Sequence, residues 1–277
     1  MRARWLLNLL LLLVVAGLAA LAYFRPGLDE PLPPPSLSSA LPEQAQRIQI
    51  ERTGRETISM VRDAAGGWQI TTPVNLAANS FRIEPLLQVR RMVSRSSFPA
   101  VDNALDHYGL SSPQAWLSID GERYAFGGVE PLNGYRYVMI DRTVHLLSDR
   151  TQNYLLMSPY DFVALELLPT QRELLTIRFD NRVINDELAL AAWGEAHARR
   201  VSRYVESESE FKSELGSDSE SEVESLSLIL ADGSMLQIDI LMREPEFMLG
   251  VRERGVRYHF TEEEGERLLA MLEGDDA

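Results

Sequence analysis

The stretch from Gly127 to Gly134 has the residue types that most resemble a ligand-binding loop. Its paired glycines leave main-chain N–H groups able to approach an anion, and Tyr135 and Tyr137 follow directly. No helix follows to add its dipole, and no lysine lies nearby. A bulged hairpin connection explains the same glycines. Both interpretations stay open for the five residues concerned, which are Gly127, Gly128, Gly134, Tyr135 and Tyr137.

Catalytic and metal-binding signals are weak elsewhere. The sequence has no phosphate-binding loop, nucleophile elbow, His-Glu-x-x-His or dinucleotide fingerprint. Its four histidines lie far apart, and no two share the helical spacing that presents both rings to one metal. His145 and His259 fall in predicted strands, so we interpret them as ordinary sheet residues. We therefore assign no catalytic, metal or cofactor-binding residue and expect a protein that is not an enzyme.

Composition excludes several classes of function. The formal net charge of -14 argues against binding to nucleic acid, whose phosphates require a face rich in Lys and Arg. The absence of cysteine excludes disulfides, thiolate catalysis and Cys-ligated metals. A chain of 277 residues with 45% hydrophobic residues is sufficient to bury a core.

The N-terminal residues predict a membrane anchor. Trp5 to Phe24 carries no charge and has about the 20 residues that cross a bilayer as a helix. Arg2 and Arg4 precede it, so the positive-inside rule places the N-terminus in the cytoplasm and the main domain in the periplasm. Cleavage as a signal peptide after Ala22 is the alternative. Both interpretations predict export across a bacterial inner membrane.

Composition then divides the rest of the chain. Residues 25–46 are rich in proline, which favours an extended stalk. Residues 206–224 are almost entirely serine and acidic residues, and we interpret them as a long solvated loop. The expected organisation is a transmembrane signal-anchor at 1–24, the stalk at 25–46, a first α+β unit at 47–170 and a second at 171–277.

The first unit opens with hairpins and a helix. Period-two alternation broken by glycine turns predicts three antiparallel strands between Arg47 and Ile70. Asn79 or Ser80 is expected to cap a helix from Phe81 to about Val93. We expect this helix to end in a basic cluster of Arg90, Arg91 and Arg95, which either lies on a solvated face or interacts with the C-terminal end of the helix dipole.

A repeat of pattern organises the remainder. Strands are predicted in four ranges, namely 115–119, 123–127, 135–140 and 143–147, with an Asp120-Gly121 turn after the first. The turn recurs as Asp232-Gly233, followed by Phe247 and Val256 in equivalent strands. A strand at Leu174 to Phe179 and a helix-prone stretch from Glu187 to Tyr204 precede this second copy. The expected fold class is α+β, with two related units of antiparallel β-hairpins and packed helices after one transmembrane helix.

Several local sequences together resemble a known family. They are Gly67-Trp68-Gln69-Ile70 with Pro73, Tyr108-Gly109-Leu110-x-x-Pro113, Phe126-Gly127 and Tyr135-x-Tyr137-Val138. In these residues the chain resembles domain-of-unknown-function family 4340, and the resemblance covers about Ile48 to Pro159. The resemblance implies a bacterial envelope protein partnering an inner-membrane complex, such as components of a gliding-type ABC transport system. It implies no catalytic residues, and Trp68, Tyr108, Gly109, Leu110 and Pro113 have structural explanations as a hairpin core residue and a helix stop.

The predicted function is therefore a membrane-anchored accessory or scaffold protein in the periplasm. A module that binds an envelope glycan, lipid or peptide is the alternative, and an unrecognised envelope hydrolase is a weaker one.

Overall fold

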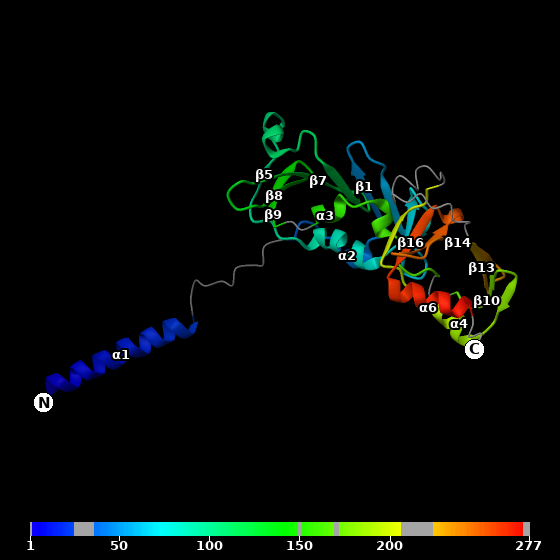
Figure 1. The fold of residues 1–277 in the computed structure, drawn as a ribbon. Helices are drawn as coiled ribbons and strands as arrows, with labels where there is room; N and C mark the ends of the chain where they lie inside the picture. The colour runs from blue at the N-terminus through cyan, green and yellow to red at the C-terminus, as the bar shows by residue number, and fades with distance from the viewer. Residues whose placement is uncertain (1, 25–35, 149–150, 169–171, 206–223, 274–277) are drawn as a thin grey trace. The chain divides into compact units, whose positions relative to one another are not determined.

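The computed structural model describes residues 2–24, 36–148, 151–168, 172–205 and 224–273 (Figure 1). The chain divides into two units, Met1–Ser36 and Leu37–Ala277. Helix α1 (Arg2–Phe24) forms the described part of the first unit, apart from Ser36. Side chains at 2–4, 7 and 21–24 are outside the described set, as are residues 25–35 of the expected stalk and 206–223 of the acidic stretch. Among the residues that are described, no helix has both the length and the apolarity to cross a membrane.

The first half of the second unit forms a nine-stranded antiparallel sheet in the order β4-β3-β2-β1-β6-β7-β8-β9-β5. Alternating residues point into the core, as Ile48 and Ile50 do from β1. The strands are β1 (Arg47–Arg52), β2 (Ile58–Arg62), β3 (Trp68–Thr72), β4 (Leu76–Ala77), β5 (Ser97–Pro99), β6 (Ala115–Ile119), β7 (Glu122–Val129), β8 (Arg136–Ile140) and β9 (Thr143–Leu147).

The second half forms a seven-stranded antiparallel sheet in the order β11-β10-β13-β14-β15-β16-β12. Its strands are β10 (Leu174–Phe179), β11 (Arg182–Ile184), β12 (Arg200–Arg203), β13 (Glu224–Leu230), β14 (Met235–Met242), β15 (Phe247–Val251) and β16 (Val256–Phe260). An α+β fold of two antiparallel sheets with a few helices is thus confirmed. The four-strand order β6 to β9 recurs as β13 to β16, with an Asp-Gly turn after the first strand of each.

Short helices connect and cover the strands. They are η1 (Pro42–Gln44), α2 (Ser80–Leu87), η2 (Gln88–Arg91), η3 (Asp102–Tyr108), α3 (Gln152–Leu155), η4 (Pro159–Phe162), α4 (Glu187–Gly194), η5 (Arg252–Arg254) and α6 (Glu262–Glu273). Helices α4 and α6 lie side by side on the second sheet (Figure 1), where Trp193 Nε1 donates to Leu268 O at 3.1 Å. The Asn79 side chain caps α2 by accepting from Phe81 N–H, as predicted.

Two helix predictions were too long. The helix expected to reach Val93 ends at Leu87 and tightens into the 3-10 turn η2. Pro85 within α2 has no N–H and crowds the preceding turn, which weakens the α-helix there. The stretch Glu187–Tyr204 is helical only to Gly194, and Arg200–Arg203 forms strand β12. Pairing with β16 outweighs the local helix propensity of these residues.

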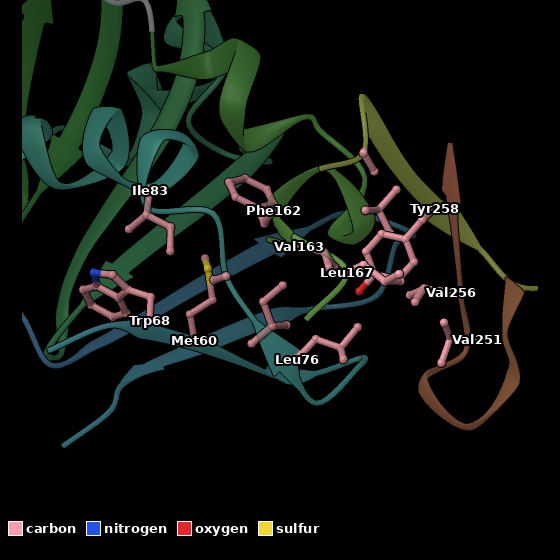
Figure 2. Packing of buried hydrophobic residues seen from close by; sticks show 14 of the residues in the cluster. Met60, Trp68, Leu76, Ile83, Phe162, Val163, Leu167, Val251, Val256 and Tyr258 are labelled. Atoms are coloured by element: carbon pink, nitrogen blue, oxygen red, sulfur yellow. The ribbon is translucent and has the colours of Figure 1, made fainter. Parts of the chain in front are cut away.

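One hydrophobic core spans both sheets (Figure 2). Met60 and Trp68 from the first sheet and Val251 and Tyr258 from the second belong to the same buried cluster. Leu167, from the segment that links the sheets, is fully buried in it. The stretch Leu37–Ala277 is therefore one compact unit.

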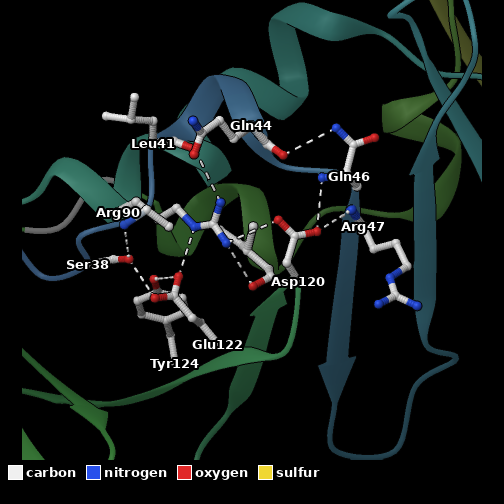
Figure 3. Close-up of polar contacts among 11 residues, drawn as sticks. Ser38, Leu41, Gln44, Gln46, Arg47, Arg90, Asp120, Glu122 and Tyr124 are labelled. Carbon is white, nitrogen blue, oxygen red and sulfur yellow. Dashed lines mark hydrogen bonds and ion pairs between the residues drawn. The ribbon is translucent and has the colours of Figure 1, made fainter.

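Arg90 corrects the expectation of a solvated basic face. The residue is only 2% exposed. Its Nε lies 2.9 Å from Glu122 Oε2 and its Nη2 lies 3.2 Å from Asp120 Oδ2, as Figure 3 shows. The same guanidinium donates to the carbonyl oxygens of Ile119 and Leu41. A charge buried at this depth is stabilised by such paired and hydrogen-bonded partners.

The same polar cluster fastens the chain before β1 to the sheet. Ser38 Oγ donates to Glu122 at 2.5 Å, and Asp120 Oδ1 accepts from the N–H groups of Gln46 and Arg47 (Figure 3). Residues 37–46, expected as part of the stalk, thus belong to the folded unit. Arg91, by contrast, is exposed and pairs with Glu43 at 2.6 Å, while Arg95 lies 5.8 Å from the Tyr135 ring.

Candidate functional site

A cavity of about 580 Å³ lies where the two sheets meet. This volume is within the range of about 300–1,000 Å³ that ligand pockets typically have. The first sheet contributes β3, β4 and the turn before β3, and the second contributes β16 and η5. We call it the inter-sheet cavity. The charged and hydroxyl-bearing side chains that line it are Asp63, Ser80, Glu166, Arg172, Arg254 and Tyr258.

The turn between β2 and β3 shapes the first-sheet wall. Asp63 Oδ1 accepts from the N–H groups of Ala65 and Gly67 at 2.9 and 2.8 Å, which fixes the turn. Trp68 follows, with its side chain in the core and the Arg62 guanidinium 5.1 Å from its ring. The Gly-Trp pair thus builds the hairpin and the core, and the same two residues border the cavity.

The segment 162–168 links the two sheets along one wall of the cavity. Ala164 N–H donates to Ala77 O, on edge strand β4, at 2.9 Å. Leu167 N–H donates to Ala196 O, before β12, at 3.0 Å. Because main-chain hydrogen bonds hold this segment on both sides, the cavity wall is part of the folded framework.

Arg254 and Tyr258 form much of the second-sheet wall. Arg254 Nη1 donates to Leu167 O at 2.8 Å and lies 3.4 Å from the Tyr258 hydroxyl. Burial raises the pKa of Tyr258, and the nearby Arg254 charge only partly offsets this. The phenol therefore stays protonated at neutral pH and can donate a hydrogen bond. Arg172 is half-exposed at the rim and lies 3.7 Å from Asp232.

The wall of the inter-sheet cavity combines hydrogen-bond donors, carboxylates and some apolar surface. Two guanidinium groups and a phenol supply donors for a carboxylate. The Asp63 carboxylate already accepts two N–H groups of its own turn, and Glu166 lies 3.7 Å from His197 at the surface. Apolar surface from Leu76 and Val163 completes the lining.

The glycines of the predicted ligand loop lie against η3. Gly127 and Gly128 are in β7, where the pairing with β8 is irregular between Phe126 and Val129. A Cβ at Gly127 would lie 2.3 Å from Tyr108 O, and one at Gly109 would lie 2.9 Å from Gly128 N. These glycines therefore allow η3 to pack closely on β7, and the irregular pairing beside them is consistent with the bulged hairpin connection. A ligand at this loop stays a prediction.

The aromatic residues of that region form a small satellite core. The Tyr108 ring lies tilted against the ring of Tyr137, with centroids 4.8 Å apart, and against that of Phe98, at 5.3 Å. Leu110 is buried beneath them, and Gly109 ends η3 in the left-handed conformation with φ +65°. Three more residues have predicted roles. Pro113 is buried, and Gly134 and Tyr135 follow the exposed turn after β7.

Of the predicted site residues, only Trp68 borders the inter-sheet cavity. Arg172, Arg254 and Glu166 were missed because they are far apart in sequence and share no spacing motif. In the described parts of the chain, no group of three or more His, Asp or Glu side chains is placed to hold a metal ion.

A family model described as Domain of unknown function (DUF4340) matches residues 68–225. No curated protein and no solved structure matches the chain. The matched range begins at Trp68 on the cavity wall and ends just inside β13. It therefore includes the segment 162–168 that links the two sheets, whereas Arg254 and Tyr258 lie beyond it.

Proposed function

The chain belongs to the family described as Domain of unknown function (DUF4340), and from that premise we propose a membrane-anchored accessory or scaffold protein of the bacterial envelope. Support for the anchor comes from the uncharged run Trp5–Phe24, preceded by Arg2 and Arg4, within the range of helix α1. In this proposal the N-terminus is cytoplasmic and the unit from Leu37 onward is periplasmic.

The inter-sheet cavity is the observation that carries the accessory role. It is large enough for a few side chains and offers Arg172, Arg254 and Tyr258 as donors. Arg172 and Arg254 balance the two carboxylates of the lining, Asp63 and Glu166, so the cavity is formally neutral in a chain whose net charge is -14. The occupant we propose is a short acidic segment of an inner-membrane partner, with an ABC-type complex as the class of partner.

Crosslinking in membranes tests this proposal. The tagged full-length chain is expected to recover one specific membrane partner, and R172E is expected to reduce the recovery at least about tenfold, since a buried or half-buried charge pair contributes about 1.5 kcal/mol or more. Arg178→Glu is the matched control, because Arg178 is exposed on β10 outside the cavity. Equal recovery by wild type and R172E would refute the cavity as the docking site, and no recovery with several crosslinkers would refute the scaffold role.

A small envelope ligand in the same cavity is the second candidate, because the cavity volume of about 580 Å³ is that of a ligand pocket. Titration of the Leu37–Ala277 unit with envelope peptides and glycans distinguishes the two. If a peptide or glycan raises the melting temperature of the wild type but not of R172E, the cavity binds a small ligand. If no thermal shift is seen at saturating concentrations, the small-ligand candidate is excluded.

We also propose that the two four-strand meanders are related units. Both have an Asp-Gly turn after the first strand, at Asp120-Gly121 and Asp232-Gly233. In the second unit the Thr261 hydroxyl caps α6 by accepting from Glu264 N–H at 3.3 Å. The corresponding position, Asp149, lies outside the described residues.

A further inference from the structure

Strands β12 and β16 and the residue before β15 bring together a serine, a histidine and a carboxylate outside the inter-sheet cavity. Ser202 Oγ lies 2.7 Å from His259 Nε2, and His259 Nδ1 lies 3.0 Å from Glu246 Oε2. Both ring nitrogens are thus engaged, one by a hydroxyl and the other by a carboxylate. A hydroxyl, an imidazole and a carboxylate linked in this order form the nucleophile, base and orienting acid of serine hydrolases, an arrangement that recurs on unrelated folds.

The strand register explains how three distant residues meet. Arg200 pairs with His259 and Ser202 pairs with Arg257, so the two residues of β12 share one face with His259. Met248 pairs with His259 from the other side, which places Glu246 beside the imidazole. The central strand β16 therefore presents His259 between its two neighbours.

The protonation states fit the proposed roles. Burial lowers the pKa of His259; the hydrogen bond that its ring donates to Glu246 raises it, and the charge of Arg200 lowers it further. The imidazole is therefore neutral at pH 7 and able to accept a proton. Burial would raise the pKa of Glu246, but the interactions with His259 and Arg200 lower it overall, so this group is a carboxylate. Arg200 lies 3.2 Å from Glu246.

Ser202 lies on the edge strand β12 and is partly exposed. Its side chain is half-buried, whereas His259 is only 3% exposed. Strand β12 is at the edge of the sheet, and no strand in the described residues pairs with its outer side. An edge strand presents main-chain N–H groups outward. Such groups beside the nucleophile are the kind of donor that stabilises an oxyanion.

We propose that Ser202, His259 and Glu246 form an acyl-hydrolysing site that acts on carboxylic esters. Ser202 Oγ attacks the ester carbonyl carbon while His259 Nε2 takes the hydroxyl proton. The tetrahedral intermediate collapses, the C–O bond to the alcohol breaks, and the imidazolium returns the proton to the departing alkoxide. Water then attacks the acyl-serine with His259 again as base, which releases the acid and restores the Ser202 hydroxyl.

A serine-reactive fluorophosphonate tests this inference on the full-length chain in detergent. We expect one covalent adduct, located by peptide mass spectrometry at Ser202, and hydrolysis of p-nitrophenyl acetate above the buffer rate. Ser202→Ala should abolish both signals. Ser227→Ala is the matched control and should retain both, because Ser227 Oγ donates to Gln237 rather than to a histidine.

The variants of the other two residues separate catalysis from folding. His259→Gln and Glu246→Gln should lower the rate of adduct formation at least about a hundredfold and tenfold, respectively, since a general base contributes about 10²–10⁴-fold. If His259→Gln fails to fold, Glu246→Gln and S202A provide the comparison. Absence of an adduct at Ser202 in the folded wild type would overturn the inference, as would equal labelling of wild type and E246Q. The result is independent of partner recovery, so it does not depend on the scaffold proposal.

Discussion

At the scale of single residues, Arg90 is the clearest case of a charge that stabilises the fold. Its guanidinium contacts Asp120, Glu122 and two carbonyl oxygens at a site with 2% exposure. Arg90→Ala would leave both carboxylates without their cation. We expect a loss of about 3 kcal/mol in the free energy of unfolding, measured by urea titration, because removing one partner of a buried pair is costly.

The neighbouring arginine is the control for this prediction. Arg91 pairs with Glu43 at 2.6 Å, but both side chains are more than half exposed. Arg91→Ala should therefore cost less than about 1 kcal/mol. Equal losses in the two variants would contradict the structural role assigned to Arg90.

His259 makes stability depend on pH. Burial lowers its folded-state pKa below the ordinary value of 6.5, so the unfolded chain binds the proton at a higher pH than the folded chain does. The contribution of neutral His259 to the free energy of unfolding is therefore fully present above about pH 6.5. It is lost as the pH falls from that value through the lower folded-state pKa. Burial lowers the pKa of His145 too, and its contribution has the same sign.

We therefore expect H259Q to lose less stability than wild type when pH falls from about 7.5 to about 5.5, as measured by the urea midpoint at each pH. His145→Gln should separately reduce the dependence of the urea midpoint on pH. If the urea midpoint of H259Q depends on pH as strongly as that of the wild type, the His259 ring does not control the pH response.

At the scale of elements, the contact between η3 and β7 explains the paired glycines. A methyl group at Gly127 would lie 2.3 Å from Tyr108 O and 2.9 Å from the Leu110 side chain. Gly127→Ala should cost about 2 kcal/mol, because overpacking displaces the main chain. Gly128→Ala is the matched control, since its Cβ would lie 3.5 Å from Tyr108 O. Thermal denaturation of both variants measures the difference, and a neutral Gly127 variant would contradict the role assigned to close packing of η3 on β7.

At the scale of the whole molecule, the shared core predicts that both sheets unfold together. Leu167 is fully buried at the link between them, and its N–H bonds to Ala196. Leu167→Ala should cost about 3 kcal/mol through the cavity it leaves. Hydrogen exchange should then show reduced protection in both β1 and β16. Loss of protection confined to one sheet would show that the halves unfold independently.

Local sequence determined much of the secondary structure. The period-two strands, the Asp-Gly turns, the Asn79 cap and the Gly109 stop all depend on residues within a few positions, so they could be predicted. The fold class of hairpins with packed helices followed from them. Local sequence also identified Trp68 as a core residue, because a tryptophan in a short hairpin buries its ring.

Only the tertiary structure decided which polar residues meet. Arg90 is buried because Asp120 and Glu122 converge on it, and β12 is a strand because β16 pairs with it. The inter-sheet cavity and the cluster of Ser202, His259 and Glu246 likewise bring together residues that are far apart in the chain. No spacing rule covers such groups, because pairing between distant strands sets their distances and burial sets their charge.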